Sequence, residues 1–369
     1  MSLISMMMVL YVHAYTLDLN GYAGALTPDK NYNTFIQDMI SHGFMRVASP
    51  VFFIISGFLL FFKFDLSSST ILLNYRKRVR SLLVPFLLWS AIGILIYYVL
   101  QLSPALKPFF SNRIISELTL IQLLDTLVLN PIPYQLWFVR NLIVLVLLSP
   151  IVWITVRYLK EPILLVILAC WIAEIDLVLF RSDALFFFSI GCLLAQKPSL
   201  LKRKGVPGWY PVLLLTWGGI VILKTALATG GYDNLFVLML LHKVAIVVGI
   251  VALWSVVSIV ATQYPDLLNK KLINHYITPF FIYTFHEPVL TILKKGALAV
   301  LPSDTHFPVL LVYLLVPLVV VLLAIVTSQV LKLYAPWLFS LLTGSRHHSK
   351  PAPAPQVAPM PVQRVEDSY

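Results

Sequence analysis

The sequence is poor in charged residues and in cysteine, and each shortage argues against a class of protein. Only 12% of its 369 residues are charged while 59% are hydrophobic, and the mean hydropathy is +0.87. Charged residues make up about a quarter of an ordinary water-soluble domain. Only two cysteines occur, Cys170 and Cys192, and both lie in apolar stretches, which argues against a disulfide framework or a cysteine metal site. We therefore expect an integral membrane protein without redox chemistry.

Several motifs that hold cofactors or metals are also missing from the sequence. There is no Gly-rich phosphate loop, no pair of histidines spaced as in a metalloprotease helix and no cluster of His and carboxylate ligands. We expect no metal and no permanently bound cofactor. The first apolar stretch lacks a basic flank and a small-residue cleavage site, so we interpret it as a retained helix rather than a signal peptide.

Long apolar stretches are what the chain has instead. A helix needs about 20 apolar residues to cross a hydrocarbon core of about 30 Å. The stretch at 184–196 is short, which suggests a tilted or re-entrant helix or one extended by its flanks. We expect an all-α, polytopic membrane bundle of about ten transmembrane helices in one domain, 1–344, followed by a disordered Pro-rich tail, 345–369. The ten stretches are 1–19, 46–62, 82–101, 135–156, 162–180, 184–196, 209–229, 235–260, 276–295 and 307–332.

The basic residues predict the orientation of this bundle. Most of the 27 Lys and Arg residues fall on one side, in the segments 63–81, 157–161, 197–208 and 261–275 and in the C-terminal tail. Cytoplasmic loops retain such residues, so both termini are expected in the cytoplasm. The net charge of +11 then reflects topology and contact with anionic lipid headgroups, and it requires no nucleic acid.

The opposite, outer side receives the other loops. The two long ones lie near 20–45 and 102–134, and the second holds a possible amphipathic piece, Ile114 to Leu129.

A small set of ionisable side chains interrupts the apolar stretches near this outer side. Burying a charge or an imidazole in a bilayer is costly, so such residues indicate a functional site. With a rise of about 1.5 Å per residue, all of them can surround one cavity in the outer half of the membrane. They are His13, Arg46, Arg140, His242, Lys243, His286 and Glu287.

Each of these residues also has a purely structural interpretation. His13 lies near an interface and can bond a headgroup or a loop carbonyl, and Arg46 at a helix end can be a snorkelling anchor. Trp137 fits an aromatic belt, and His242–Lys243 fits a polar contact between helices. His286-Glu287-Pro288 is harder to dismiss, because the proline frees a backbone carbonyl next to two ionisable groups.

Seven short segments, in order from about residue 3 to 346, resemble one family. They are Leu10–His13, Arg46–Phe58, Tyr75–Pro85, Leu136–Arg140, Phe187–Gly191, Phe281–Pro288 and Leu342–Arg346. Together they resemble the acyltransferase-3 family of integral-membrane O-acyltransferases, typically ten-helix bacterial proteins that modify cell-surface sugars. Two positions depart from the family pattern. Ser2 stands eleven residues before His13, where Arg is usual, and Asn141 stands where similar sequences often carry Asp.

The resemblance implies transfer of an acyl group, acetyl above all, from acetyl-CoA or another acyl-CoA to a hydroxyl of a cell-surface or lipid-linked glycan. The location it implies is the bacterial inner membrane. His13 matches the catalytic histidine of the family and is expected to be the general base. Arg46 or Arg140 would stabilise the oxyanion.

His286 and Glu287 are also expected to be catalytic, and the remaining candidate residues are assigned to substrates. His286 and Glu287 would orient His13 or the acceptor sugar, Trp137 would offer a stacking face, and His242 and Lys243 would contact substrate. Arg76, Arg78 and Arg80 would hold the phosphates of coenzyme A, although anchoring on the cytoplasmic side alone also explains them.

A secondary transporter or flippase for a glycan intermediate is the alternative. It would use the same cavity and the His, Glu and Lys groups as a proton relay. The sequence shows no internal inverted repeat and no pair of matching broken helices, which favours the enzyme. A purely structural scaffold would leave the clustered charge unexplained.

Overall fold

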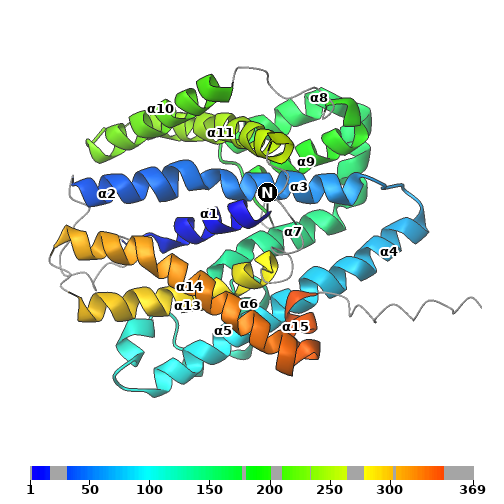
Figure 1. Ribbon diagram of the computed structural model, residues 1–369. Helices are drawn as coiled ribbons and strands as arrows, with labels where there is room; N and C mark the ends of the chain where they lie inside the picture. The colour runs from blue at the N-terminus through cyan, green and yellow to red at the C-terminus, as the bar shows by residue number, and fades with distance from the viewer. Residues whose placement is uncertain are drawn as a thin grey trace, which may run out of the picture.

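Helices make up nearly all of the chain that the computed structural model describes, residues 2–16, 31–176, 180–200, 210–232, 234–263, 278–301 and 305–344 (Figure 1). These ranges contain no β-strand. An apolar segment in lipid has no water to bond its backbone groups, so it satisfies them within a helix. The Pro-rich tail 345–369 lies outside the described residues.

Two long helices, the one that includes α3 (Ala48–Phe61) and the one that includes α5 (Val84–Leu102), begin earlier in the chain than their apolar stretches predict. α1 (Ser2–Ala14) is followed by α2 (Tyr32–Gln37), which continues through the π-helical η1 (Asp38–Gly43) and the 3-10 turn η2 (Phe44–Val47) into α3. Likewise α4 (Ser68–Arg78) continues through the π-helical η3 (Val79–Leu83) into α5. The loops expected near 20–45 and 63–81 are therefore largely helical where they are described.

Side-chain caps explain where these helices begin. The Asn31 carboxamide oxygen accepts from the backbone N–H groups of Asn33 and Thr34, at 2.9 and 3.0 Å, and the Ser67 hydroxyl accepts from that of Thr70 at 3.3 Å. Such caps satisfy backbone donors that the first turn of a helix leaves without partners. Polar residues that resemble a loop in the sequence thus start helices here.

The segment between α5 and the next long helices contains short elements. These are η4 (Lys107–Phe110), η5 (Ile115–Glu117), α6 (Leu120–Val128) and η6 (Tyr134–Leu136). A capping box between Thr119 and Gln122 starts α6, inside the amphipathic piece expected from Ile114 to Leu129.

The next two helices are bent relative to each other. α7 (Trp137–Leu147) and α8 (Ser149–Ile172) meet at 68°, and the backbone of α8 breaks at Lys160, where φ is 49°. This break lies in the segment 157–161, where a loop is expected.

The remaining elements are mostly long helices. They are α9 (Ser182–Gln196), η7 (Pro198–Leu200), α10 (Tyr210–Thr229), α11 (Leu235–Gln263), α13 (Pro279–Val300), α14 (His306–Tyr334) and α15 (Pro336–Thr343). Every expected apolar stretch falls on a helix where it is described. Within the described ranges, however, only five helices are long and apolar enough to cross a membrane, or six if the bent pair α7–α8 counts as one span.

Three of the expected spans differ from a regular long helix. α1 and α9 are short, and α13 is interrupted at Glu287, whose φ of −110° and ψ of 135° are not helical. Large apolar side chains such as Leu95, Leu215 and Leu322 are 60%, 76% and 62% exposed on the outside of the bundle. An exposed apolar surface of this kind is typical of helices that face lipid.

α1 has a central place in the bundle. It contacts α3, α13 and α14, and Figure 1 shows it between α2–α3 on one side and α13–α14 on the other. α3 packs along α9, α9 along α8, and α10 along α11. The residues at the end of α1 therefore meet side chains from several other helices.

Candidate active site

His13 lies in the last turn of α1 and opens on a cavity of about 340 Å³. Side chains from four parts of the chain line this cavity: the end of α1 and the residue after it, η1–η2, η6 and α13. They are Val12, His13, Tyr15, His42, Arg46, Tyr134, Thr291 and Lys294. We call it the histidine cavity. It combines imidazoles, cations and phenols in an otherwise apolar bundle.

The three residues expected to be catalytic lie together. The rings of His13 and His286 are stacked, with centroids 5.4 Å apart and planes 27° from parallel. The ring of Tyr134 meets the His13 ring edge to face at 4.8 Å, and its hydroxyl donates to a Glu287 carboxylate oxygen at 3.1 Å. Tyr134, which the sequence reasoning missed, thus connects His13 with Glu287.

The break in α13 places His286 and Glu287 at this site. Where the helix is interrupted, the Gln135 side-chain amide donates to the carbonyls of Thr284 and Glu287, both at 3.3 Å, and the Tyr283 hydroxyl donates to the Gln135 carbonyl. A broken helix in lipid needs such replacement partners. Both ring nitrogens of His286 are buried with no hydrogen-bond partner among the described residues. A buried polar group of this kind is costly unless it serves a ligand or a reaction.

Lys294 fixes the end of α1. Its ammonium donates to the carbonyl oxygens of His13 and Tyr15 at 2.7 and 3.0 Å, and the residue is only 3% exposed. The last carbonyls of a helix lack intrahelical partners and carry partial negative charge, so a cation there is favourable. Sequence reasoning missed this residue as well, although a lysine inside an apolar stretch is itself a signal.

A second cavity, of about 220 Å³, adjoins the first, because Arg46 lines both. We call it the tryptophan cavity. Its polar and aromatic lining is Arg46, Ser49, Trp137, Trp171, Glu174, Arg181, Asp183, Phe187, His242 and Lys243. Of the residues expected around one cavity, His13 lines the histidine cavity, His242 and Lys243 line the tryptophan cavity, and Arg46 lines both.

The charges in the tryptophan cavity are paired. The Lys243 ammonium donates to the Trp171 carbonyl at 2.7 Å and to a Glu174 carboxylate oxygen at 3.3 Å. The Arg181 guanidinium lies over the Trp137 ring at 5.4 Å and bonds Asp183 at 3.1 Å. The face of Trp137 expected to stack on a sugar is therefore shared with a cation.

His286 and Glu287 line neither cavity but contact His13 and Tyr134, whereas Arg140 lines neither cavity and contacts another segment. Its guanidinium donates to the carbonyl oxygen of Leu129, at the end of α6. Arg140 therefore contacts the segment at the end of α6.

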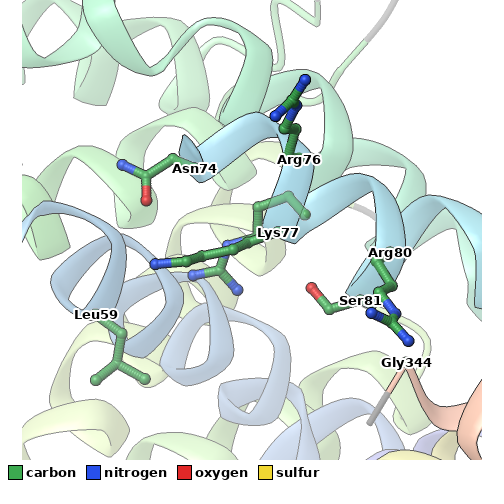
Figure 2. A pocket seen from close by; sticks show the side chains of 8 residues that line it. Leu59, Asn74, Arg76, Lys77, Arg80, Ser81 and Gly344 are labelled. Carbon is green, nitrogen blue, oxygen red and sulfur yellow. The ribbon is translucent and has the colours of Figure 1, made fainter. Parts of the chain in front are cut away.

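The basic residues expected to meet coenzyme A line a third cavity, of about 580 Å³, which we call the basic cavity (Figure 2). Its lining is Leu59, Asn74, Arg76, Lys77, Arg78, Arg80, Ser81 and Gly344, with no carboxylate among these residues. Gly344, with φ of +62°, lets the end of α15 lie close to the backbone of η3, since a Cβ there would lie 2.5 Å from the Ser81 Cα. Four basic side chains around one cavity can hold an anion with several phosphates.

No group of three or more His, Cys, Asp and Glu side chains within the described ranges is arranged to hold a metal ion. The expectation of no metal stays a prediction.

Comparison with known proteins identifies the family. Residues 3–329 match the family described as acyltransferase domain. The chain is also similar to the succinoglycan biosynthesis protein ExoH of Rhizobium meliloti (strain 1021), with 23% identity over 346 residues, which is 91% of this chain and 87% of that protein. No solved structure matches the chain. Because the family match covers most of its length, the protein belongs to the acyltransferase-3 family, as the seven sequence segments indicated.

Proposed function

We propose that this protein is a membrane O-acyltransferase that moves an acyl group, acetyl in the first instance, from acyl-CoA to a hydroxyl of a cell-surface or lipid-linked glycan. One observation supports it above others: in a chain of an acyltransferase family, His13 opens on a cavity that it shares with Arg46 and Tyr134. The similarity to a protein named for succinoglycan biosynthesis supports a polysaccharide acceptor.

His13 is the proposed general base. A sugar hydroxyl is a poor nucleophile until a base takes its proton, and a positioned base typically contributes about 10²–10⁴-fold to the rate. The hydroxyl oxygen then bonds to the acyl carbon, the proton passes to the imidazole, and the carbon–sulfur bond breaks to release coenzyme A. The tetrahedral intermediate carries an oxyanion, for which Arg46, on the wall of the same cavity, is the proposed partner.

Three neighbours would position the base. Lys294 holds the carbonyl of His13 itself, and the ring of His286 supports one face of the imidazole. Glu287 acts one step further away, because its carboxylate orients the Tyr134 hydroxyl and hence the ring beside His13. Such support keeps the reacting groups in a productive geometry.

The basic cavity is the proposed site for the phosphates of the donor. In the proposed topology α1 and α9 are short crossings and α13 is a broken one, which gives about ten crossings with both termini in the cytoplasm. The basic cavity then lies towards the cytoplasm and the histidine cavity towards the outside. The reactive end of the donor therefore has to reach partway across the membrane.

The tryptophan cavity is the proposed site for the acceptor. Arg46 lines it as well as the histidine cavity, so a glycan bound there lies next to the proposed base. Aromatic rings beside carboxylates such as Glu174 and Asp183 suit sugar rings and their hydroxyls. Trp137, His242 and Lys243 would contact the glycan there, whereas Arg140 would act only through the Leu129 segment.

The test is acyl transfer by the purified protein in lipid, with radiolabelled acetyl-CoA and a pool of surface-glycan precursors. We expect label on a glycan with the wild type and a loss of about 10²-fold or more with His13→Ala. His306→Ala is the matched control, since His306 contacts Tyr32 instead of lining the histidine cavity. Full transfer by a folded His13→Ala protein would contradict the base assignment. A folded wild type that releases no coenzyme A and acylates nothing would favour the transporter.

A further inference from the structure

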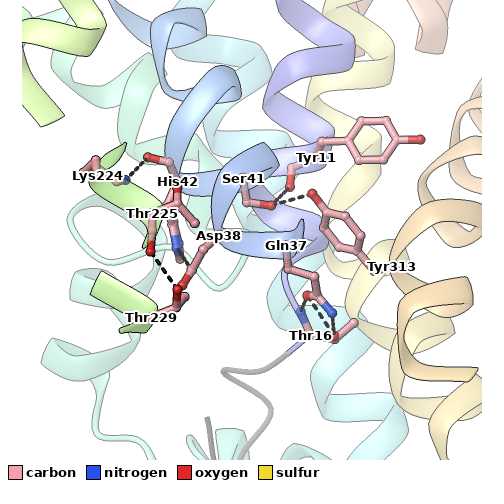
Figure 3. Close-up of polar contacts among 10 residues, drawn as sticks. All are labelled: Tyr11, Thr16, Gln37, Asp38, Ser41, His42, Lys224, Thr225, Thr229 and Tyr313. Carbon is pink, nitrogen blue, oxygen red and sulfur yellow. Dashed lines mark hydrogen bonds and ion pairs between the residues drawn. The ribbon is translucent and has the colours of Figure 1, made fainter. Parts of the chain in front are cut away.

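Asp38 and His42 form a carboxylate–imidazole pair at the edge of the histidine cavity (Figure 3). An Asp38 carboxylate oxygen lies 2.8 Å from Nδ1 of His42. Of the ion pairs within the described ranges, it is the one that joins a carboxylate to a histidine. A carboxylate on Nδ1 fixes the proton there and leaves the other ring nitrogen to accept a proton.

The backbone around the pair is held from two sides. The Lys224 ammonium of α10 donates to the His42 carbonyl at 2.7 Å, and the Ser41 hydroxyl donates to the Tyr11 carbonyl and lies 2.9 Å from the Tyr313 hydroxyl (Figure 3). These bonds do not use the side chains of Asp38 or His42. The pair is therefore placed by its surroundings and is not needed to hold η1 in position.

The local helix form is also unusual. Asp38 and His42 are four residues apart in the π-helical η1, and such single-turn π segments are frequent at functional sites.

Of the three histidines of this region, His286 is fully buried, whereas His13 and His42 are both half-buried. The His42 side chain is 30% exposed, with Asp38 beside it at 21%. His13 and His42 line the same cavity. The charged or titratable groups that face His42 include Tyr15, whose ring lies 4.5 Å away, and Arg46 and Lys294 on the cavity wall.

We propose that His42 is a second proton-transfer residue, which takes the proton from His13 and passes it to the outer solvent, and that Asp38 is its positioning residue. This rests on the proposed acyltransferase function. After the ester forms, the proton of the acceptor hydroxyl is on His13. It moves to the free ring nitrogen of His42 and then to water, which restores neutral His13. Coenzyme A leaves as the thiolate on the donor side and takes its proton there, so the reaction balances.

The experiment measures turnover of the full-length protein in lipid vesicles with labelled acetyl-CoA. We expect His42→Ala to lower kcat about tenfold or more while the acceptor KM stays the same, and imidazole added to the outer solution to restore much of the loss. Asp38→Asn should lower kcat as well, and Asp38→Glu should restore part of it. His306→Ala should match the wild type and not respond to imidazole.

Two results overturn the inference. The first is a kcat equal to that of the wild type in both His42→Ala and Asp38→Asn. The second is a loss of kcat in His42→Ala that imidazole does not restore, although the variant elutes and unfolds like the wild type. If His42→Ala does not fold, His42→Gln and Asp38→Asn give the same comparison. A wild type that transfers no label overturns the proposed function itself, and the inference with it. Transfer that needs His13 but not His42 overturns the inference alone.

Discussion

Gly57 of α3 and Gly191 of α9 lie back to back, with no side chain between the two helices at that point. A Cβ added to Gly57 would lie 3.3 Å from the Gly191 Cα, and one added to Gly191 would lie 2.7 Å from the Phe58 nitrogen and 3.0 Å from the Gly57 Cα. Small residues at such a crossing let two membrane helices pack backbone to backbone. This contact brings α9, and the tryptophan cavity near its N-terminal end, against α3.

We predict that Gly57→Ala or Gly191→Ala destabilises the protein, because the new Cβ meets backbone atoms that cannot turn away. Overpacking of this kind typically costs about 1–3 kcal/mol, and occasionally more. The measurement is thermal unfolding in detergent. Gly218→Ala in α10 is the control, since a Cβ there meets nothing within 4 Å. An unfolding temperature of Gly57→Ala equal to that of Gly218→Ala would contradict the prediction.

Tyr134→Phe should lower acyl transfer in protein that still folds. The substitution keeps the ring against His13 and removes the hydroxyl that bonds Glu287 at 3.1 Å. Leaving a buried carboxyl oxygen without its donor costs about 1–3 kcal/mol, so a loss of about fivefold or more in kcat is expected. Tyr98→Phe, at an exposed residue of α5, is the matched control. Equal kcat in the two variants would show that the hydroxyl does not contribute.

Replacing both Arg78 and Arg80 by Gln should raise the KM for acyl-CoA with little change in kcat. The two side chains line the basic cavity, and a charge-assisted bond to phosphate is worth about 1.5–3 kcal/mol, which corresponds to at least tenfold in KM. Steady-state kinetics at varied acyl-CoA measures the change. Lys63→Gln, a basic residue outside that cavity, serves as control. An unchanged KM would leave these arginines as membrane anchors.

Lys243→Met should destabilise the protein more than Glu174→Gln does. The first substitution leaves the buried Trp171 carbonyl without its donor at 2.7 Å, which lowers the free energy of unfolding by about 1–3 kcal/mol. The second removes only an ion pair whose carboxylate is 67% exposed, which is worth less than about 1 kcal/mol. Thermal unfolding of both variants tests the order, and the reverse order would mean that the carboxylate is the main partner of Lys243.

The sequence predicted correctly that three of the ionisable residues in its apolar stretches lie near each other. His13, His286 and Glu287 come from opposite ends of the chain, yet each interrupts an apolar stretch at a similar depth, and they meet at one site. The cost of burying such groups in lipid is what makes this reasoning effective. Their chemical roles remain predictions.

Two of the missed residues, Tyr134 and His42, were missed for a common reason. Tyr134 and His42 lie in segments that are polar enough to resemble loops, although His42 belongs to a helix that continues into α3. Tertiary contacts hold that helix together: the Gln37 amide donates to the Thr16 hydroxyl at 2.8 Å, and Ser41 bonds Tyr11. No local pattern contains these contacts, because they join residues 21 and 30 positions apart.

Helix lengths were predicted less well than helix positions. Hydropathy marks the apolar part of a helix, but α4 and η3 are basic and still continue into α5 without a break. The break at Glu287 was signalled by Pro288, whereas the amide of Gln135 that bonds the interrupted backbone belongs to another element, η6. Hydropathy along one segment carries no information about partners from another.

The volume of the histidine cavity has a consequence for the selectivity of the reaction. At about 30 Å³ for each water molecule in the liquid, a polar cavity of about 340 Å³ has room for several waters when no glycan is present. In the proposed reaction, a base that takes a proton from a sugar hydroxyl can also take one from water, and the thioester would then be hydrolysed. Productive transfer would therefore require the glycan to displace this water before the thioester arrives, which would make the order in which the two substrates bind a property of the cavity.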